Sequence, residues 1–279
     1  MTTESRNYMN YSGLWALVTG ASSGIGWHIS IELAKRGCNI IGVSNQPLPL
    51  DNLKKEVESS QSVKVVTLIQ DLASEEAASS VFNYCQEQSL SVDILVNNAG
   101  VLLYGEMVGS GYTTMKSILQ LHVTTPALLC RLFGERMKGQ KSGYILNVSS
   151  ISAVMPFPTI SVYGPTKAFL RYFTRAIRTE MEPYGVNVTC LLPGATDTPL
   201  NDPLQLDVRR GKTFGIVKSP GSVAKAGLVA LFRNRAVCVP GLLNKAIVFI
   251  IPLIPHMLIS LIYRQRIRSA AQSDAKQKQ

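Results

Sequence analysis

Tyr163 and Lys167, four positions apart, carry side chains that together can perform acid–base chemistry. On a helix this spacing puts both side chains on one face, about one turn apart. A phenol with its ordinary pKa of about 10 is a poor proton donor or acceptor near neutrality. A neighbouring ammonium favours the phenolate and lowers that pKa. The pair predicts a general acid/base for a carbonyl or an alcohol, with chance spacing on a helix as the alternative for the pair taken alone.

A glycine-rich turn near the start of the chain predicts a phosphate-binding site. The apolar run Leu14–Val18 precedes the turn Thr19–Gly26, and a stretch with helical apolar spacing follows it and ends at Gly37. This pattern predicts a strand, a turn and a helix, whose N-terminal amides and dipole attract an anion. The spacing G-x-x-x-G-x-G differs from the standard dinucleotide fingerprint. A plain glycine turn is the alternative, but the context favours cofactor binding.

Short apolar runs alternate with longer periodic stretches along the rest of the chain. Further strands are expected at Asn39–Val43, Lys64–Ile69, Val92–Val96, Tyr144–Val148, Val186–Leu192 and Ala236–Val239. Helices are expected at Ser74–Gln88, Tyr112–Met137, Tyr163–Glu182 and Ser222–Phe232. This alternation predicts an α/β fold, a doubly wound parallel sheet of the Rossmann type in a single domain. Ligands of such sheets bind at the carboxyl ends of the strands.

Polar residues follow the predicted strands at that end. After the second strand, a dinucleotide site reads the adenine ribose: an acidic residue suits a 2′-hydroxyl and a basic one a 2′-phosphate. Here Ser44, Asn45 and Gln46 are neither, and the missing carboxylate weakly favours NADP over NAD. Asp71 follows the third strand, either as an acceptor for the adenine amino group or as the N-cap of the next helix.

In this order, the motifs resemble those of the short-chain dehydrogenase/reductase family over roughly residues 13–240. The matching residues are Thr19-Gly20-x-x-x-Gly24-Ile25-Gly26, Asp71-Leu72, Asn97-Asn98-Ala99-Gly100, Ser150, Tyr163-x-x-x-Lys167 and Pro193-Gly194-x-x-x-Thr198. The resemblance implies NAD(P) as cofactor and hydride exchange between a carbonyl and an alcohol. It also implies a homodimer or homotetramer built through the helices at Tyr112–Met137 and Gly164–Glu182.

The resemblance further implies roles for individual residues. Tyr163 is the acid/base, Lys167 lowers its pKa and holds the nicotinamide ribose, and Ser150 positions the substrate oxygen. Spacing favours Ser150 over its neighbours Ser149 and Ser152. The full set of expected cofactor-binding residues is Gly20, Ser22, Ser23, Gly24, Ile25, Gly26, Asn45, Asp71, Leu72, Asn98, Ala99, Gly100, Tyr163, Lys167, Thr196 and Thr198.

His122 departs from the family pattern, which usually has an Asn here that helps a water relay to the lysine. The relay water is held mainly by the main-chain carbonyl of that residue, which a histidine also offers. Alternatively, the imidazole packs in the core with its hydrogen bonds satisfied. We therefore expect His122 in the catalytic group, with retained activity and a changed pH dependence.

Charge and cysteine usage bound the class of protein. Residues 1–200 carry 15 basic and 15 acidic residues, whereas residues 201–279 carry 13 and 3 and hold the whole net charge of +10. The body therefore has no basic footprint for nucleic acid. Five scattered cysteines without a C-x-x-C, three histidines without ligand spacing and a polar N-terminus predict reduced thiols, no metal and a cytoplasmic protein.

The last part of the chain differs from the body. The connection 195–221 is long enough to predict a lid over the crevice, with an ordinary disordered loop as the alternative. Ala246–Tyr263 has no charged residue, but Pro252 and Pro255 break it into two short helices, which makes spanning a bilayer improbable. Either it packs on the domain or a second subunit, or residues 246–268 make a peripheral membrane contact. In both cases we expect it to contact apolar partners without being part of the catalytic machinery.

The predicted organisation is an N-terminal tail (1–12), the Rossmann-type domain (13–243), an apolar C-terminal extension (244–268) and a disordered basic tail (269–279). The predicted function is an NAD(P)-dependent oxidoreductase that interconverts a ketone and a secondary alcohol. Because the extension is apolar, a lipophilic substrate is expected, such as an acyl chain or a steroid-like ring system. The alternative is a catalytically silent NAD(P)-binding sensor or scaffold, including one at a membrane surface.

Overall fold

The computed structural model describes residues 11–198, 217–261 and 263–265 and is built on one parallel sheet. Its seven strands lie in the order β3-β2-β1-β4-β5-β6-β7, and every neighbouring pair is parallel. The strands are β1 (Trp15–Thr19), β2 (Asn39–Ser44), β3 (Val65–Ile69), β4 (Val92–Asn97), β5 (Gly143–Val148), β6 (Val186–Leu191) and β7 (Val237–Cys238). The predicted fold class and all seven predicted strands are confirmed.

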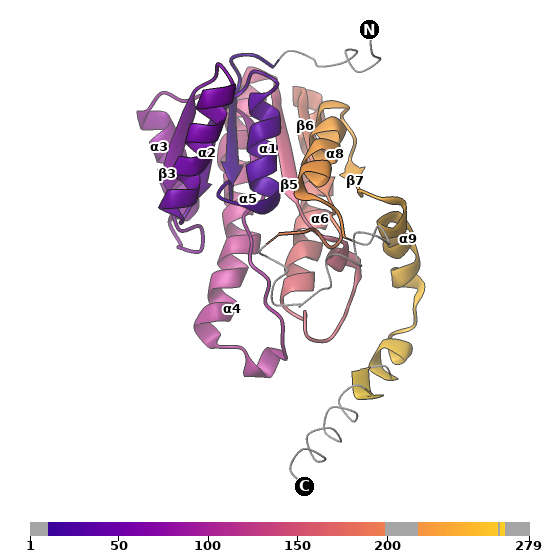
Figure 1. Ribbon diagram of the computed structural model, residues 1–279. Helices are drawn as coiled ribbons and strands as arrows, with labels where there is room; N and C mark the ends of the chain where they lie inside the picture. Colours follow the sequence, from indigo (N-terminus) through magenta and orange to yellow (C-terminus); the bar gives the residue numbers. More distant parts are fainter. Residues whose placement is uncertain (1–10, 199–216, 262, 266–279) are drawn as a thin grey trace.

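Helices cover both faces of this sheet (Figure 1). One apolar core lies between the sheet and the helices α1 (Gly24–Ala34), α2 (Pro47–Ser60) and α8 (Pro220–Phe232). The other lies between the sheet and the helices α3 (Ala77–Glu87), α5 (Thr125–Gln140) and α6 (Tyr163–Met181). The central strands are buried on both faces, which is why they read as continuous apolar runs rather than as alternating patterns.

The sequence prediction missed helix α2. Leu50, Leu53 and Val57 lie on its buried face at helical spacing. Two prolines at its start concealed this periodicity, although proline is well tolerated in the first turn of a helix.

The long helix expected at Tyr112–Met137 is interrupted. It begins as α4 (Tyr112–Leu119), passes through the π-helical turn η3 (Gln120–Thr124) and continues as α5. Such π-helical turns are rare and are frequent at functional sites. This one carries His122.

The N-terminal tail expected at residues 1–12 includes one residue that packs into the body. The ring of Tyr11 is buried and stacks on Phe232 with ring centroids 4.0 Å apart. Tyr144 meets the same cluster edge-on. This aromatic cluster closes the core at the end of the sheet where the strands begin.

The C-terminal extension leaves the body at the end opposite to the N-terminus (Figure 1). Helix α9 (Leu242–Ile250) spans the boundary expected at residue 244 and is followed by the short 3-10 helix η7 (Ile251–Leu253). A bend of 100° separates this part from the helix His256–Gln265, which confirms the predicted break at Pro252 and Pro255. Within the described residues no single helix is long and apolar enough to cross a membrane. The two segments on either side of the bend, Leu242–Leu253 and His256–Gln265, together meet that criterion by length and composition alone.

Other sequence expectations fall outside the described residues. Most of the predicted lid, residues 199–216, lies there, as does the basic tail at 269–279.

Candidate active site

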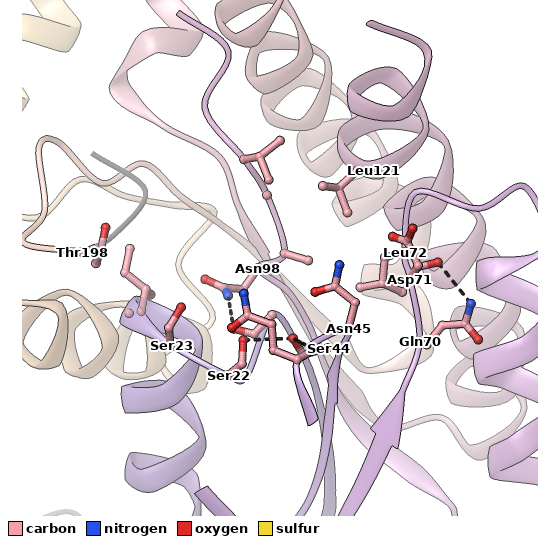
Figure 2. Close-up of a pocket in the computed structure, with 17 residues that line it drawn as sticks. Ser22, Ser23, Ser44, Asn45, Gln70, Asp71, Leu72, Asn98, Leu121 and Thr198 are labelled. Atoms are coloured by element: carbon pink, nitrogen blue, oxygen red, sulfur yellow. Dashed lines mark hydrogen bonds between the residues drawn. The ribbon is translucent and has the colours of Figure 1, made fainter. Parts of the chain in front are cut away.

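A crevice opens at the carboxyl ends of strands β1 to β4 (Figure 2). Twelve of the predicted cofactor-binding residues line it: Gly20, Ser22, Ser23, Gly24, Ile25, Asn45, Asp71, Leu72, Asn98, Ala99, Gly100 and Thr198. The predicted cofactor-binding set left out five further lining residues, Ser44, Gln46, Gln70, Val101 and Leu121, of which Ser44 and Gln46 had been placed at the ribose end. Four of these directly adjoin predicted residues in the chain, so extending each motif by one position finds them. Leu121 comes from η3, where no motif signals it.

The first part of the crevice is a cradle for an anion. Gly20 and Gly24 both adopt positive φ, of 64° and 56°, which lets the turn curl back towards the start of α1. Ser23, the N-cap of α1, makes no side-chain cap hydrogen bond. The first amides of the helix are therefore available to a phosphate, and the helix dipole adds to the attraction. These residues fit the diphosphate of a dinucleotide.

Asn98 and Thr19 hold the shape of this cradle. The Asn98 side-chain amide donates to the carbonyls of Thr19 and Gly20, at 3.0 and 3.2 Å. The Thr19 hydroxyl accepts from the backbone amides of Asn98 and Ala99. The end of β4 is thereby tied to the glycine-rich turn after β1.

Gly26 does not line the crevice, although it belongs to the predicted cofactor-binding set. It lies under the turn, where a Cβ at this position would stand 2.2 Å from the Gly20 carbonyl oxygen. Gly26 thus permits close packing of α1 on the turn. Thr196 also lies outside the crevice lining; it is buried and donates to the Gly194 carbonyl.

The ribose end of the crevice is polar and neutral. The Ser44 hydroxyl donates to the Ser22 hydroxyl at 2.9 Å and accepts from the Gln46 amide. Figure 2 shows Asn45 beside this pair. Among the lining residues the only charged one is Asp71. Two hydroxyls and an amide offer hydrogen bonds to a 2′-hydroxyl or a 2′-phosphate, with no carboxylate of β2 to repel the phosphate.

Asp71 does not cap the helix that follows it, so that alternative is wrong. Helix α3 begins at Ala77 with Glu76 as its N-cap. The Asp71 carboxylate instead accepts from the Ala73 amide within a local turn at 3.0 Å. Its side chain lines the crevice, where it can accept from an adenine amino group.

Tyr163, Lys167 and Ser150 come together where β5 ends and α6 begins. Tyr163 is the first residue of α6, Lys167 follows one turn later, and Ser150 lies two residues after β5. All three side chains are buried. The Lys167 ammonium lies 5.8 Å from the centroid of the Tyr163 ring and donates to the Val148 carbonyl at 3.1 Å.

The neighbouring serines have different surroundings. The Ser149 hydroxyl is buried and donates to the Lys167 carbonyl at 2.7 Å, which fixes α6 to the end of β5. The Ser150 hydroxyl donates to the Ser152 hydroxyl at 3.0 Å, and its interaction with the Tyr163 side chain favours a lower pKa of that phenol. Among the three serines, Ser150 is the one that acts on the phenol; its predicted role in positioning the substrate oxygen stays a prediction.

Burial controls the pKa values of this group. It raises the pKa of Tyr163, and the hydrogen bond with Ser150 acts in the opposite direction. Burial also lowers the pKa of Lys167 to about 8. Burial thus outweighs any lowering of the Tyr163 pKa by Lys167, whose ammonium is bonded to the Val148 carbonyl; the predicted role of Lys167 towards the phenol stays a prediction. At neutral pH the phenol keeps its proton and the lysine remains mostly charged.

His122 is a fully bonded core residue. It is 1% exposed, and its Nε2 accepts from the Val101 backbone amide at 3.0 Å. Nδ1 therefore carries the proton and donates to the Thr166 hydroxyl, also at 3.0 Å. Burial and the nearby Lys167 charge hold the pKa of His122 well below its usual value. The imidazole is neutral and packed in the core with its hydrogen bonds satisfied; a water relay through the main-chain carbonyl of His122 stays a prediction.

The position of His122 nevertheless connects it to the acid/base. Its ring meets the Tyr163 ring edge-on, with centroids 5.8 Å apart. Thr166, which accepts from His122, donates in turn to the Tyr163 backbone carbonyl at 2.8 Å. A hydrogen-bonded chain therefore runs from the end of β4 through His122 to the first turn of α6.

Asn97 faces the interior of the sheet, unlike Asn98 beside it. Its side-chain amide donates to Asn147 on β5 at 2.8 Å, and Asn147 donates to Thr174 on α6 at 2.9 Å. The sequence places Asn97 in a cofactor motif; the structure shows that it links β4, β5 and α6.

A parallel sheet with a phosphate cradle and a Tyr–Lys pair at one edge defines a dinucleotide-dependent oxidoreductase. The family model described as short chain dehydrogenase matches residues 14–209. The chain therefore belongs to the short-chain dehydrogenase/reductase family, as its motifs predicted.

Two relatives of this chain are named for a hydroxysteroid and for a very-long-chain 3-oxoacyl-CoA. It is 30% identical over 198 residues to 17-beta-hydroxysteroid dehydrogenase type 3 of Rattus norvegicus, covering 70% of this chain and 63% of that protein. It is 32% identical over 188 residues to very-long-chain 3-oxoacyl-CoA reductase-A of Danio rerio, covering 65% and 57%. The matched part thus spans about three fifths of the length of these relatives.

Solved structures resemble nearly the whole chain. A short-chain dehydrogenase from Sphingobium yanoikuyae in complex with NADPH superposes with a TM-score of 0.75 at 27% identity, covering 94% of this chain and 96% of that one. The bulky-bulky ketone specific alcohol dehydrogenase from Comamonas testosteroni gives 0.72 at 26% identity, covering 92% and 94%.

Proposed function

We propose that this protein interconverts a lipophilic ketone and the corresponding secondary alcohol, with Tyr163 as the general acid/base. The observation that carries the proposal is the buried group of Tyr163, Ser150 and Lys167 at the end of β5, beside the crevice. A sensor that only binds the cofactor has no use for a buried phenol with a serine and an ammonium beside it.

In the direction of reduction, each of these residues has a separate task. The nicotinamide cofactor, when bound, supplies the hydride. Tyr163, protonated at neutral pH because burial raises its pKa, donates its proton to the carbonyl oxygen. Ser150 orients that oxygen by a hydrogen bond, and the Lys167 charge stabilises the phenolate that remains. In oxidation, Tyr163 takes the proton back.

Two sets of observations support the cofactor and substrate classes. The cradle at Gly20–Gly24 suits a diphosphate, and the neutral ribose end at Ser44–Gln46 supports a modest preference for NADP over NAD. A lipophilic substrate is supported by relatives named for hydroxysteroids and very-long-chain 3-oxoacyl-CoA, and by the apolar extension beside the site.

The decisive experiment is a screen of steroid-like and acyl ketones, and of the matching alcohols, with NADPH, NADH and their oxidised forms. Absorbance of the reduced nicotinamide reports turnover. We expect turnover with at least one lipophilic ketone and tighter binding of NADPH than of NADH in a fluorescence titration. Cofactor binding without turnover of any substrate in either direction would favour the silent sensor, and a clear NADH preference would contradict the reading of the ribose end.

We further propose a homodimer or homotetramer formed through α4, α5 and α6. Supporting this, Leu128 on α5 and Phe169 and Tyr172 on α6 are exposed apolar side chains. Mass measurement in solution tests the oligomer. The cytoplasmic location stays a prediction.

A further inference from the structure

The C-terminal extension exposes large apolar side chains along most of its length. Phe249 is 76% and Leu253 71% exposed. Leu242, Ile250, Met257, Leu258 and Leu261 are also exposed. Soluble single domains rarely leave so many large apolar groups together in water, so this surface is expected to meet a partner.

The other side of the extension is anchored to the body beside the candidate active site. Asn244 in α9 is buried and donates to the Pro240 carbonyl at 2.7 Å. It lies so close to Gly194, after β6, that a Cβ there would stand 2.4 Å from its side chain. Helix α9 also contacts η4 (Ile151–Val154), the turn directly after Ser150. The exposed side chains therefore belong to an element held at the site.

A second segment presents apolar groups at the same end of the molecule. In the connection from β4 to α4, Val108 is 89% exposed and Tyr104 and Met107 are also exposed, as is Tyr112, the first residue of α4. The Tyr263 hydroxyl of the extension donates to the Glu106 carboxylate of this connection at 2.8 Å. We call these exposed residues of 104–112 and 242–261 together the apolar end; Figure 1 shows both segments below the sheet.

The net charge of the sequence from the extension onwards selects among possible partners. From Lys245 onwards the chain carries six Lys or Arg and one Asp. Two copies meeting through this end would bring two strongly basic segments together. An anionic lipid surface has the opposite charge and attracts basic residues near it. The bend of 100° and the lack of a single long apolar helix among the described residues fit an element lying in the interface.

We propose that the apolar end inserts into the boundary between head groups and acyl chains of an anionic bilayer. Bound this way, the edge of the active site between α9 and the connection 104–112 lies against the lipid. A lipophilic substrate then reaches the site from the membrane; this last consequence rests on the proposed function, whereas the membrane contact does not.

The test is co-sedimentation of the full chain with phosphatidylcholine vesicles that contain or lack phosphatidylserine. We expect binding to the vesicles with phosphatidylserine and weaker binding as salt rises. Phe249→Glu combined with Leu253→Glu should reduce the vesicle partition constant at least tenfold, and Val108→Glu should reduce it less. Leu48→Glu is the matched control: Leu48 is 76% exposed at the start of α2, on the far edge of the sheet, and its variant should bind as the wild type does.

Thermal melting and cofactor titration check that each variant is folded. The proposal is wrong if the wild type binds neither kind of vesicle. It is also wrong if the double variant binds vesicles with phosphatidylserine as strongly as the wild type does. If the wild type does not bind vesicles and the double variant has a lower oligomeric mass than the wild type, the apolar end is instead an interface between copies of the chain. Vesicle binding needs no turnover, so a failure of the proposed function leaves this test intact.

Discussion

The candidate active site and the C-terminal extension lie side by side but are built on opposite principles. Tyr163, Lys167 and His122 are almost completely buried, and hydrogen bonds join Lys167 and His122 to other elements. In the extension, side chains such as Phe249 and Leu253 have no apolar cover. The properties of the active site depend on the position of each atom, whereas those of the extension depend on which side chains it exposes.

This difference separates the effects that substitutions should have. In the buried region, one atom gained or lost changes distances within a network and therefore turnover or the free energy of unfolding. In the extension, one exposed side chain changes little in the isolated protein, because water already surrounds it. The predictions below follow this contrast, from the largest expected effect to the smallest.

Replacing Tyr163 by Phe should have the largest effect on turnover. Removing a general acid/base typically lowers the rate by roughly 10²–10⁴-fold, and the ring alone cannot donate a proton. Cofactor affinity, followed by fluorescence titration, should be nearly unchanged. Tyr172→Phe is the control, since Tyr172 is 65% exposed on the same helix and should retain full activity. Near wild-type turnover of Tyr163→Phe on an identified substrate would remove the proposed mechanism.

Lys167 should make stability depend on pH in the alkaline range. Its pKa is about 8 in the folded chain, against an ordinary value of 10.5, because burial disfavours the charge. Above about pH 8 the unfolded chain therefore binds more protons, so stability rises with pH until about 10.5. The integrated effect is about 3 kcal/mol.

Urea unfolding of the wild type and of Lys167→Met at several pH values measures this contribution as a difference. Other groups titrate in both proteins and cancel. The stability of the wild type relative to the variant should rise over this interval and stay constant below it. A relative stability that is flat or falls with pH would show that Lys167 is not desolvated as described.

Adding a single methyl group at Gly26 should damage the cofactor cradle. The new Cβ would stand 2.2 Å from the Gly20 carbonyl oxygen, so α1 or the turn must move. Overpacking of this kind costs about 1–3 kcal/mol, and cofactor affinity should fall with it. Gly109→Ala is the control, because open space surrounds that position. Unchanged cofactor affinity in Gly26→Ala would contradict the close packing described.

Replacing His122 by Asn should cost less, about 1–2 kcal/mol, because the shorter side chain cannot bond both Val101 and Thr166. The effect on pH dependence has a definite sign. The pKa of folded His122 lies well below 6.5, so as pH falls below about 6.5 the unfolded chain takes up a proton that the folded chain does not. The free energy of unfolding therefore decreases as pH falls through this range.

Urea unfolding near pH 7 and near pH 5 measures how much His122 changes the free energy of unfolding with pH. The wild type should lose more stability than His122→Asn over that range, and its turnover near neutrality should show no titration of His122. An imidazole that titrates near pH 6.5, followed by NMR, would show that His122 is not buried and bonded as described.

Changing Leu253 to Ser should have the smallest effect. The side chain is 71% exposed, so the free energy of unfolding should change by less than about 0.5 kcal/mol. Cofactor affinity and the turnover of a water-soluble ketone should also remain as in the wild type. A large loss of stability would mean that the extension is covered in the folded protein, and the contrast between the two regions would disappear.

The amino-acid sequence was enough to predict the sheet and the family, and it named the candidate site residues, whose roles stay predictions. These features depend on local patterns: apolar runs for buried strands, glycines where the backbone must turn, and a four-residue spacing that any helix converts into proximity. Where the local pattern was masked, as by the prolines at the start of α2, the prediction failed.

Only the tertiary structure decided what depends on partners distant in the chain. His122 is neutral because Val101 and Thr166 occupy its two nitrogens, and the phenol of Tyr163 keeps its proton because the fold buries it. Gly26 serves packing, and α9 lies beside the turn after Ser150. Burial and hydrogen bonding are set by residues that the fold brings together from far apart in the sequence, so no local pattern can encode them.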